Sequence, residues 1–198
     1  MPDVVPSLQQ RVRDQARDEV AQHALRLFLA KGFDATTVDE ICASAGLGRR
    51  TFFRYFQGKE GVVGTLFEDL GVEGSLIFLQ RPAQEDVWSA LRHCMDPFEA
   101  WTTEDPASAL ELVRLVEENT SLRAGYLTRV DAWRAGLAAV VNARAGLDDE
   151  SALYGAVVAA AAMGAFLAGV RAWLAGGGIV AVGEFFDEAF AVLAPQPR

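Results

Sequence analysis

A cluster of basic side chains is the feature of this sequence best suited to chemistry with a charged partner. Arg49, Arg50 and Arg54 lie close together in the sequence. Phe52 lies between Arg50 and Arg54, and Phe56 follows four residues after Phe52. In a helix this spacing puts both phenylalanines on one face and leaves the arginines on the other. Guanidinium groups bind phosphates and the edge of guanine. The segment therefore predicts a nucleic-acid-binding helix; an ordinary solvated basic turn beside two core phenylalanines remains the alternative.

Two short helices would position these arginines. Thr37 and Glu40 have the spacing of a capping box, which predicts a helix starting at Thr37. Gly46-Leu47-Gly48 ends it, and a second helix follows from Arg49 to Phe56. A long helix over 8–31 precedes this pair, and another is expected from Lys59 towards Leu79. Two short helices joined by a glycine-containing turn can place the second one in a DNA major groove.

At this point the sequence resembles a known family. The stretches 32–41 (GFDATTVDEI), 45–56 (AGLGRRTFFRYF) and 58–60 (GKE) are similar to the N-terminal domain of TetR-type transcriptional regulators. The resemblance implies an all-α homodimer, with a helix-turn-helix DNA-binding domain over 1–58 and an effector-binding and dimerisation domain over 59–198. It also implies repression at a palindromic double-stranded DNA operator, relieved by a small molecule.

The resemblance assigns roles to individual residues. Thr37 becomes a phosphate-contacting helix cap, and Lys59 becomes a phosphate-contacting lysine at the start of the next helix. Phe53 and Gly48 depart from the family pattern, since many members have tyrosine and serine or threonine there; Arg54 is expected to replace the lost phosphate contact. The remaining base- or phosphate-contacting positions of the recognition helix are Arg49, Arg50, Thr51 and Tyr55.

The overall charge, taken by itself, argues against DNA binding. Lys and Arg total 18 against 27 Asp and Glu, a net charge of −9, whereas nucleic-acid-binding domains usually present a positive face. Residues 1–60, however, hold 9 basic and 8 acidic side chains, and residues 61–198 hold 9 and 19. The acidity thus belongs to the second part of the chain, where it should repel DNA away from the arginine-bearing helix.

The rest of the chain also has helical spacing, which makes the predicted fold all-α. Pro97 interrupts the segment 84–101, and further helices are expected over 107–118, 122–145 and 180–193. The run 151–170 has no charged residue and is long enough to span a bilayer. It is mostly alanine and glycine, so we expect a buried helix of a cytoplasmic protein and no membrane partner.

The last two helices are candidates for a homodimer interface. In TetR-type regulators they usually pair with their twins in a four-helix bundle. Here small residues recur every four positions and permit close helix approach, and bulky side chains follow on the last helix. A core helix within one protomer is the alternative. The expected interface residues are Ala156, Ala160, Gly164, Ala168, Phe186 and Phe190.

Aromatic residues in the middle of the chain suggest an effector site. Binding pockets favour apolar and aromatic walls with few polar groups. An apolar or flat aromatic effector fits such walls best, and an acidic lining that selects a cation stays open; each aromatic residue could also be plain core. The candidates are Trp88, Phe98, Trp101, Tyr126 and Trp133, with Glu99, Asn119 and Arg134 as polar partners.

Two other classes of protein compete with a regulator. An enzyme would need reactive groups, and the histidines are only His23 and His93. His93-Cys94 hints weakly at a metal but has no third ligand nearby, so no catalytic residue, metal or cofactor is expected. A ligand-binding bundle without DNA binding is the other class, and the three outward arginines argue against it.

Overall fold

Helices build the described part of this protein. The computed structural model describes residues 7–65, 67, 70–147 and 152–194. Within these ranges every regular element is a helix, which confirms the predicted all-α fold. The chain divides into two compact units, Met1–Glu68 and Asp69–Arg198. The sequence placed this boundary after residue 58, but α4 (Lys59–Thr65) packs on the first unit's long helix through buried Val62 and Val63.

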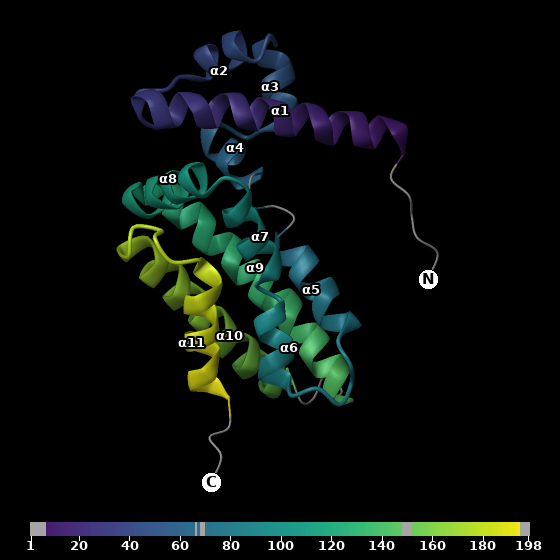
Figure 1. The fold of residues 1–198 in the computed structure, drawn as a ribbon. Helices are drawn as coiled ribbons and strands as arrows, with labels where there is room; N and C mark the ends of the chain where they lie inside the picture. The colour runs from purple at the N-terminus through teal and green to yellow at the C-terminus, as the bar shows by residue number, and fades with distance from the viewer. Residues whose placement is uncertain (1–6, 66, 68–69, 148–151, 195–198) are drawn as a thin grey trace. The chain divides into compact units, whose positions relative to one another are not determined.

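The first unit contains the predicted helix-turn-helix. Its helices are α1 (Leu8–Lys31), α2 (Val38–Ser44), α3 (Arg49–Tyr55) and α4, drawn in purple to blue in Figure 1. Phe28, Ile41 and Phe52 are buried at its centre, and burying a side chain of this size contributes about 1.5–3 kcal/mol. This core joins α1, α2 and α3 and so fixes which face α3 turns to solvent.

The start of α2 and the turn before α3 follow the predicted local chemistry. The hydroxyl of Thr37 accepts from the Glu40 backbone N–H, and the Glu40 carboxylate accepts from the Thr37 backbone N–H at 2.9 Å. The ammonium of Lys31 and these Thr37 bonds lower the pKa of Glu40 to about 2. Gly46 takes a positive φ of 65°, which L side chains rarely adopt, and so lets the chain reverse into α3.

The second unit is a bundle of seven helices in the part of the chain that is described. It contains α5 (Leu70–Gln80), α6 (Val87–His93), α7 (Asp96–Glu104) and α8 (Pro106–Glu118). The longer α9 (Thr120–Ala145) and α10 (Ala152–Ala175) follow, and α11 (Val182–Leu193) is the last. Figure 1 shows α10 running beside α9 and α11, and both pairs are in contact. Pro97 lies at the start of α7, which explains why the segment 84–101 forms two helices.

The single helix expected from Lys59 to Leu79 is instead two. Helix α4 ends at Thr65, Phe67 lies in a turn, and α5 begins at Leu70; residues 66, 68 and 69 lie outside the described ranges. The Phe67 N–H donates to the Gly64 carbonyl at 3.2 Å, a tighter bond than the α-helical one. Gly64 lies in the last turn of α4, and glycine weakens a helix by about 1 kcal/mol relative to alanine. The Phe67 side chain, which follows the end of α4, is buried.

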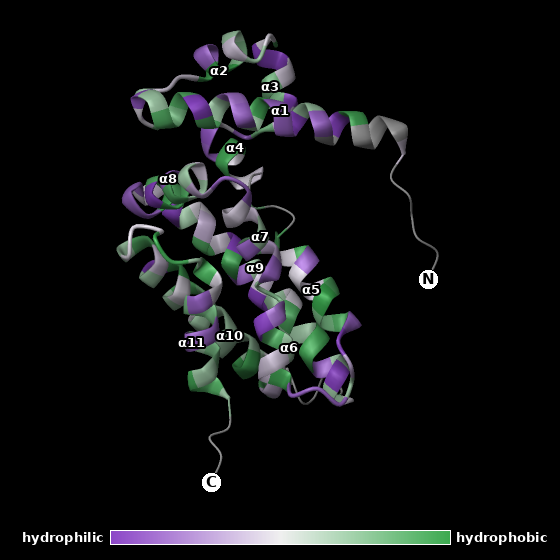
Figure 2. Cartoon of the chain, viewed as in Figure 1, coloured by the Kyte–Doolittle hydropathy of each residue, from purple (hydrophilic) through white to green (hydrophobic). Residues whose placement is uncertain are grey.

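Helix α10 contains the uncharged run expected over 151–170, of which Ser151 lies outside the described residues, and it continues past that run through Arg171. By length and composition, Leu153–Ala175 could cross a membrane, and half of its most apolar window is buried inside the protein. Figure 2 shows its apolar character along most of its length. Its buried side includes Ala159, Ala162 and Phe166. The prediction of a buried helix therefore holds for this side of α10, while the other side faces outward.

The residues expected at a dimer interface fall into two groups. Ala160, Gly164 and Ala168 lie on the outward side of α10, and Ala156 is partly exposed. Phe186 and Phe190 are buried within the protomer instead, so the expectation that they face a partner is wrong. Phe186 packs against Phe166 with ring centroids 5.5 Å apart, which explains why the bulky side of α11 turns inward.

Candidate functional site

The outer face of α3 gathers the basic residues singled out in the sequence. Phe52 and Phe56 are buried, as their spacing predicted, while Arg49, Arg50 and Arg54 are exposed. Thr37 is exposed at the start of α2, and two further residues of the predicted set are partly exposed on α3, Thr51 and Tyr55. These six residues, Thr37, Arg49, Arg50, Thr51, Arg54 and Tyr55, are therefore accessible to a partner.

Two of the exposed arginines are held by neighbouring side chains. The Arg49 Nη1 donates to both carboxylate oxygens of Asp39, at 2.7 and 2.9 Å. The Arg54 Nη2 donates to the Tyr55 hydroxyl at 3.1 Å, and its guanidinium lies 5.0 Å from the centre of the Tyr55 ring. Ordered guanidinium groups on a short exposed helix present donors in fixed directions, which suits the recognition of phosphates and base edges.

Lys59 has a different environment from the one expected. Its ammonium donates to the backbone carbonyls of Phe33 at 2.7 Å, Thr36 at 3.2 Å and Asp34 at 3.3 Å. It also lies 4.4 Å from the centre of the Phe33 ring. An ammonium has three N–H donors, and these three carbonyls can take all of them. Lys59 therefore ties the start of α4 to the loop that precedes α2.

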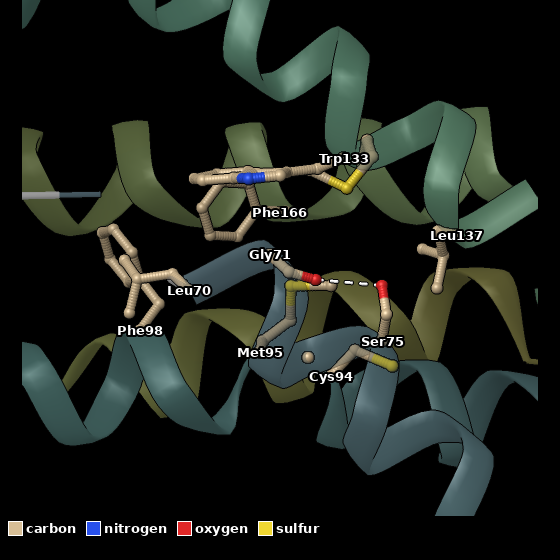
Figure 3. Close-up of a pocket in the computed structure, with 11 residues that line it drawn as sticks. Leu70, Gly71, Ser75, Cys94, Met95, Phe98, Trp133, Leu137 and Phe166 are labelled. Atoms are coloured by element: carbon tan, nitrogen blue, oxygen red, sulfur yellow. Dashed lines mark hydrogen bonds between the residues drawn. The ribbon is translucent and has the colours of Figure 1, made fainter. Parts of the chain in front are cut away.

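The second unit contains a narrow apolar pocket between α5, the α6–α7 junction, α9 and α10. Its cavity volume is about 40 Å³, which is too small for an organic ligand. Figure 3 shows the rings of Trp133 and Phe166 on one side and the start of α5 on the other, with Phe98 beside Leu70. Among the residues that the structure describes, those that line it are all uncharged: Leu70, Gly71, Gly74, Ser75, Cys94, Met95, Phe98, Trp133, Leu137, Met163 and Phe166.

Two glycines of α5 make this pocket possible. A Cβ atom on Gly71 would lie 2.0 Å from Cδ1 of the Trp133 indole, and one on Gly74 would lie 2.5 Å from the Cys94 carbonyl oxygen. Because glycine has no Cβ atom, Trp133 and the end of α6 can approach the backbone of α5. The Ser75 hydroxyl donates to the Gly71 carbonyl at 2.9 Å, as drawn in Figure 3. Burial raises the pKa of the Cys94 thiol to about 12, so the thiol is neutral near pH 7.

The predicted effector residues are only partly brought together. Phe98 and Trp133 line the pocket, whereas Trp101 and Tyr126 pack behind them, with ring centroids 5.3 Å from Phe98 and 6.3 Å from Trp133 respectively. Trp88 instead lines a separate open groove between α6 and α11. The α5 residues were missed, although two glycines three apart in an apolar helix were a signal of close packing.

The polar candidates all lie elsewhere. Glu99 pairs with Arg92 at 3.0 Å, and Arg134 pairs with Asp131 at 2.7 Å. The Asn119 side chain accepts from the first backbone N–H groups of α9 and so caps that helix. None of these three residues is among those that line the apolar pocket, so they offer no acidic lining for a cation there.

Comparison with known proteins finds a matching family for each of the two units. The family described as bacterial regulatory proteins, tetR family, matches residues 22–66, which include α2 and α3. The family described as the MftR C-terminal domain, a TetR-type domain, matches residues 85–197, more than half of the chain. The chain belongs to the TetR family. As a TetR-family protein it is a DNA-binding transcriptional regulator, and the prediction that it is not an enzyme is confirmed.

Individual relatives support the same assignment. The HTH-type transcriptional regulator TcmR of Streptomyces glaucescens is 36% identical over 150 residues, which cover 72% of this chain and 66% of TcmR. The match thus spans just under two thirds of that relative's length. The fatty acid degradation regulator FadR of Bacillus halodurans has a TM-score of 0.61 at 17% identity, covering 91% of this chain and 99% of that chain. Thermus thermophilus FadR, in complex with lauroyl-CoA, has a TM-score of 0.55 at 20% identity, covering 92% and 99%. At these identities the two structures show a shared fold.

Lys59→Met should mainly weaken the TetR-type DNA-binding unit rather than remove a phosphate contact. We expect a loss of about 1–3 kcal/mol in the free energy of unfolding, because carbonyls of the loop before α2 lose a charged donor. The slope of log affinity for DNA against log salt should change by less than about 0.9, the value for one phosphate contact. Urea unfolding and DNA binding at several salt concentrations check this. A slope change of about 0.9 with unchanged stability would show that Lys59 contacts phosphate.

Proposed function

We propose that this chain represses transcription in the bacterial cytoplasm by binding a palindromic operator as a homodimer, and that a small neutral effector in the apolar pocket releases it. The observation that carries the effector response is the position of the pocket in the chain. Leu70, Gly71, Gly74 and Ser75 of α5 line it. Helix α5 follows α4, the last helix of the DNA-binding unit, after only residues 66–69.

This connection gives the effector a route to the DNA-binding unit. The pocket is too narrow for an organic ligand as it stands, so an effector must displace the side chains or helices that line it. Displacement at the start of α5 would act on the chain directly after α4. An effector releases DNA only if it binds the non-binding arrangement more tightly than the DNA-binding one. We therefore expect effector and operator to oppose each other's binding by the same factor.

The lining favours a neutral, flat effector. Trp133, Phe98 and Phe166 offer aromatic faces, and the few polar groups are the Ser75 hydroxyl, the Trp133 N–H and the neutral Cys94 thiol. Thermus thermophilus FadR is in complex with lauroyl-CoA. The phosphates of such a thioester would need cationic partners, and none of the described residues that line this pocket is a lysine or an arginine. We thus favour a neutral aromatic compound over an acyl-CoA.

A DNA selection followed by effector competition tests this function. The full chain is first used to enrich fragments from a randomised double-stranded library, and palindromic sequences should emerge. Flavone, as a neutral planar probe, and lauroyl-CoA are then titrated against the complex with the enriched DNA, followed by fluorescence anisotropy. Flavone should release the DNA and lauroyl-CoA should not. Release by lauroyl-CoA alone would contradict the neutral effector class, and an absence of enriched DNA would contradict the operator.

The outward side of α10 supports the homodimer. Leu153 and Val157 are 76% and 58% exposed, and the series continues with exposed Ala160, Gly164 and Ala168. We call these five residues the outer face of α10; Figure 2 shows the apolar character of this helix. Contiguous exposed apolar surface commonly marks an interaction site. A second copy of the same helix provides a matching apolar face around a two-fold axis.

A further inference from the structure

Phe53 is an exposed phenylalanine on α3, the helix that carries the exposed arginines. Its side chain is 52% exposed, although it lies beside the buried Phe52. The two rings meet edge to face with centroids 5.4 Å apart, which holds Phe53 in place from the core side. The guanidinium of Arg49 lies 5.7 Å from the centre of the Phe53 ring. A cation over an aromatic face is attracted by the ring, so Phe53 supports Arg49 from its flat side.

Asp39 holds the same guanidinium by its edge. Both Asp39 oxygens accept from Arg49 Nη1, at 2.7 and 2.9 Å. The two side chains are 61% and 66% exposed, Arg49 first, and an exposed pair of this kind contributes little to stability. Asp39 itself lies in the first turn of α2, which the Thr37–Glu40 capping box fixes. The main effect of the pair is therefore on the orientation of Arg49.

The donors that remain on Arg49 have the geometry of a base reader. Nη1 is occupied by Asp39, while Nε and Nη2 have no hydrogen-bond partner among the described residues. Two adjacent N–H groups in one plane match O6 and N7 of guanine in the major groove. A phosphate contact, by contrast, needs mainly positive charge, and the carboxylate of Asp39 offsets that charge.

We propose that Asp39 and Phe53 are positioning residues that orient Arg49 to read one guanine in each half of the operator. This inference rests on the operator binding proposed above, with α3 in the major groove. Arg49 makes the base contact, and Asp39 and Phe53 act only through it. Discrimination for guanine at that base pair then depends on all three residues, while discrimination elsewhere in the operator does not.

Operator variants test this directly. The full chain is bound to the enriched DNA and to versions in which each G·C pair is replaced in turn by A·T, followed by fluorescence anisotropy at fixed salt. The wild type should lose roughly tenfold in affinity at the pair that Arg49 reads. Asp39→Ala, Phe53→Leu and Arg49→Lys should each reduce this factor towards one, and only at that pair. Thermal unfolding confirms that each variant is folded.

A matched control separates orientation from charge. Asp39→Ala also removes a negative charge, which by itself raises affinity for every DNA sequence equally. Glu19→Ala removes a negative charge from an exposed position on α1 and should keep the roughly tenfold loss of affinity when the guanine is replaced. If Asp39→Ala loses as much affinity as the wild type when each G·C pair is replaced, this inference is overturned, while operator binding still stands. A chain that enriches no sequence would overturn both.

Discussion

Gly164→Arg is expected to convert the proposed homodimer into a monomer and to lower affinity for the proposed operator at least about hundredfold. Gly164 lies in the middle of the outer face of α10, among small and apolar residues. An arginine there would be buried against the partner without a counter-charge, and burying an unpaired charge costs about 3–5 kcal/mol. The two-fold axis would place two such arginines in one interface. A monomer then binds only one half of the palindrome. Sedimentation velocity at micromolar protein and anisotropy with the enriched DNA measure both effects.

Gly136→Arg is the matched control for this substitution. Gly136 is also an exposed helical glycine, on α9, and neither glycine has an atom within 4 Å of a built Cβ. Neither change should disturb its own protomer, and arginine favours a helix over glycine by a few tenths to 1 kcal/mol. The control should remain dimeric and bind DNA normally. A Gly164→Arg protein that sediments as a dimer would show that α10 does not form the interface.

The helix-turn-helix could be predicted from sequence because local chemistry specifies it. The Thr37–Glu40 capping box, the positive φ at Gly46 and the four-residue spacing of Phe52 and Phe56 each involve residues close in the chain. Each feature forms in the structure as predicted. Such signals depend on backbone geometry and helix periodicity alone, so no knowledge of the second unit was needed to place the arginines of α3 on the outer side.

The pocket and the packing of α11 depend on contacts between distant segments, which explains where prediction failed. Gly71 matters because Trp133, 62 positions further on, lies against it. Phe186 and Phe190 form an apolar stripe that would suit either a partner or a core. Phe186 turns inward because Phe166 on α10 and Phe98 on α7 pack against its ring, with centroids 5.5 and 6.0 Å away. Composition showed that aromatic residues were abundant, but not which of them would surround a cavity.

Gly71→Val is expected to weaken effector binding at least about hundredfold. A Cβ at this position would lie 2.0 to 2.3 Å from three atoms of the Trp133 indole, so the ring must move or the helix must shift. Either change fills or closes a cavity of only about 40 Å³. Overpacking of this kind costs about 1–3 kcal/mol of stability. Flavone titration followed by tryptophan fluorescence measures the loss, and anisotropy with the enriched DNA measures operator affinity.

Gly125→Val separates loss of the pocket from the general effect of valine in a helix. Gly125 is exposed on α9, and nothing lies within 4 Å of a built Cβ there. This control should bind flavone and release DNA as the wild type does, because valine and glycine differ little in helix propensity compared with the clash at Gly71. Gly71→Ala, with a smaller side chain, should give an intermediate loss. If Gly71→Val folds and still binds flavone with wild-type affinity, the effector site must lie outside the pocket beside α5, and the open groove that Trp88 lines between α6 and α11 becomes the next surface to test.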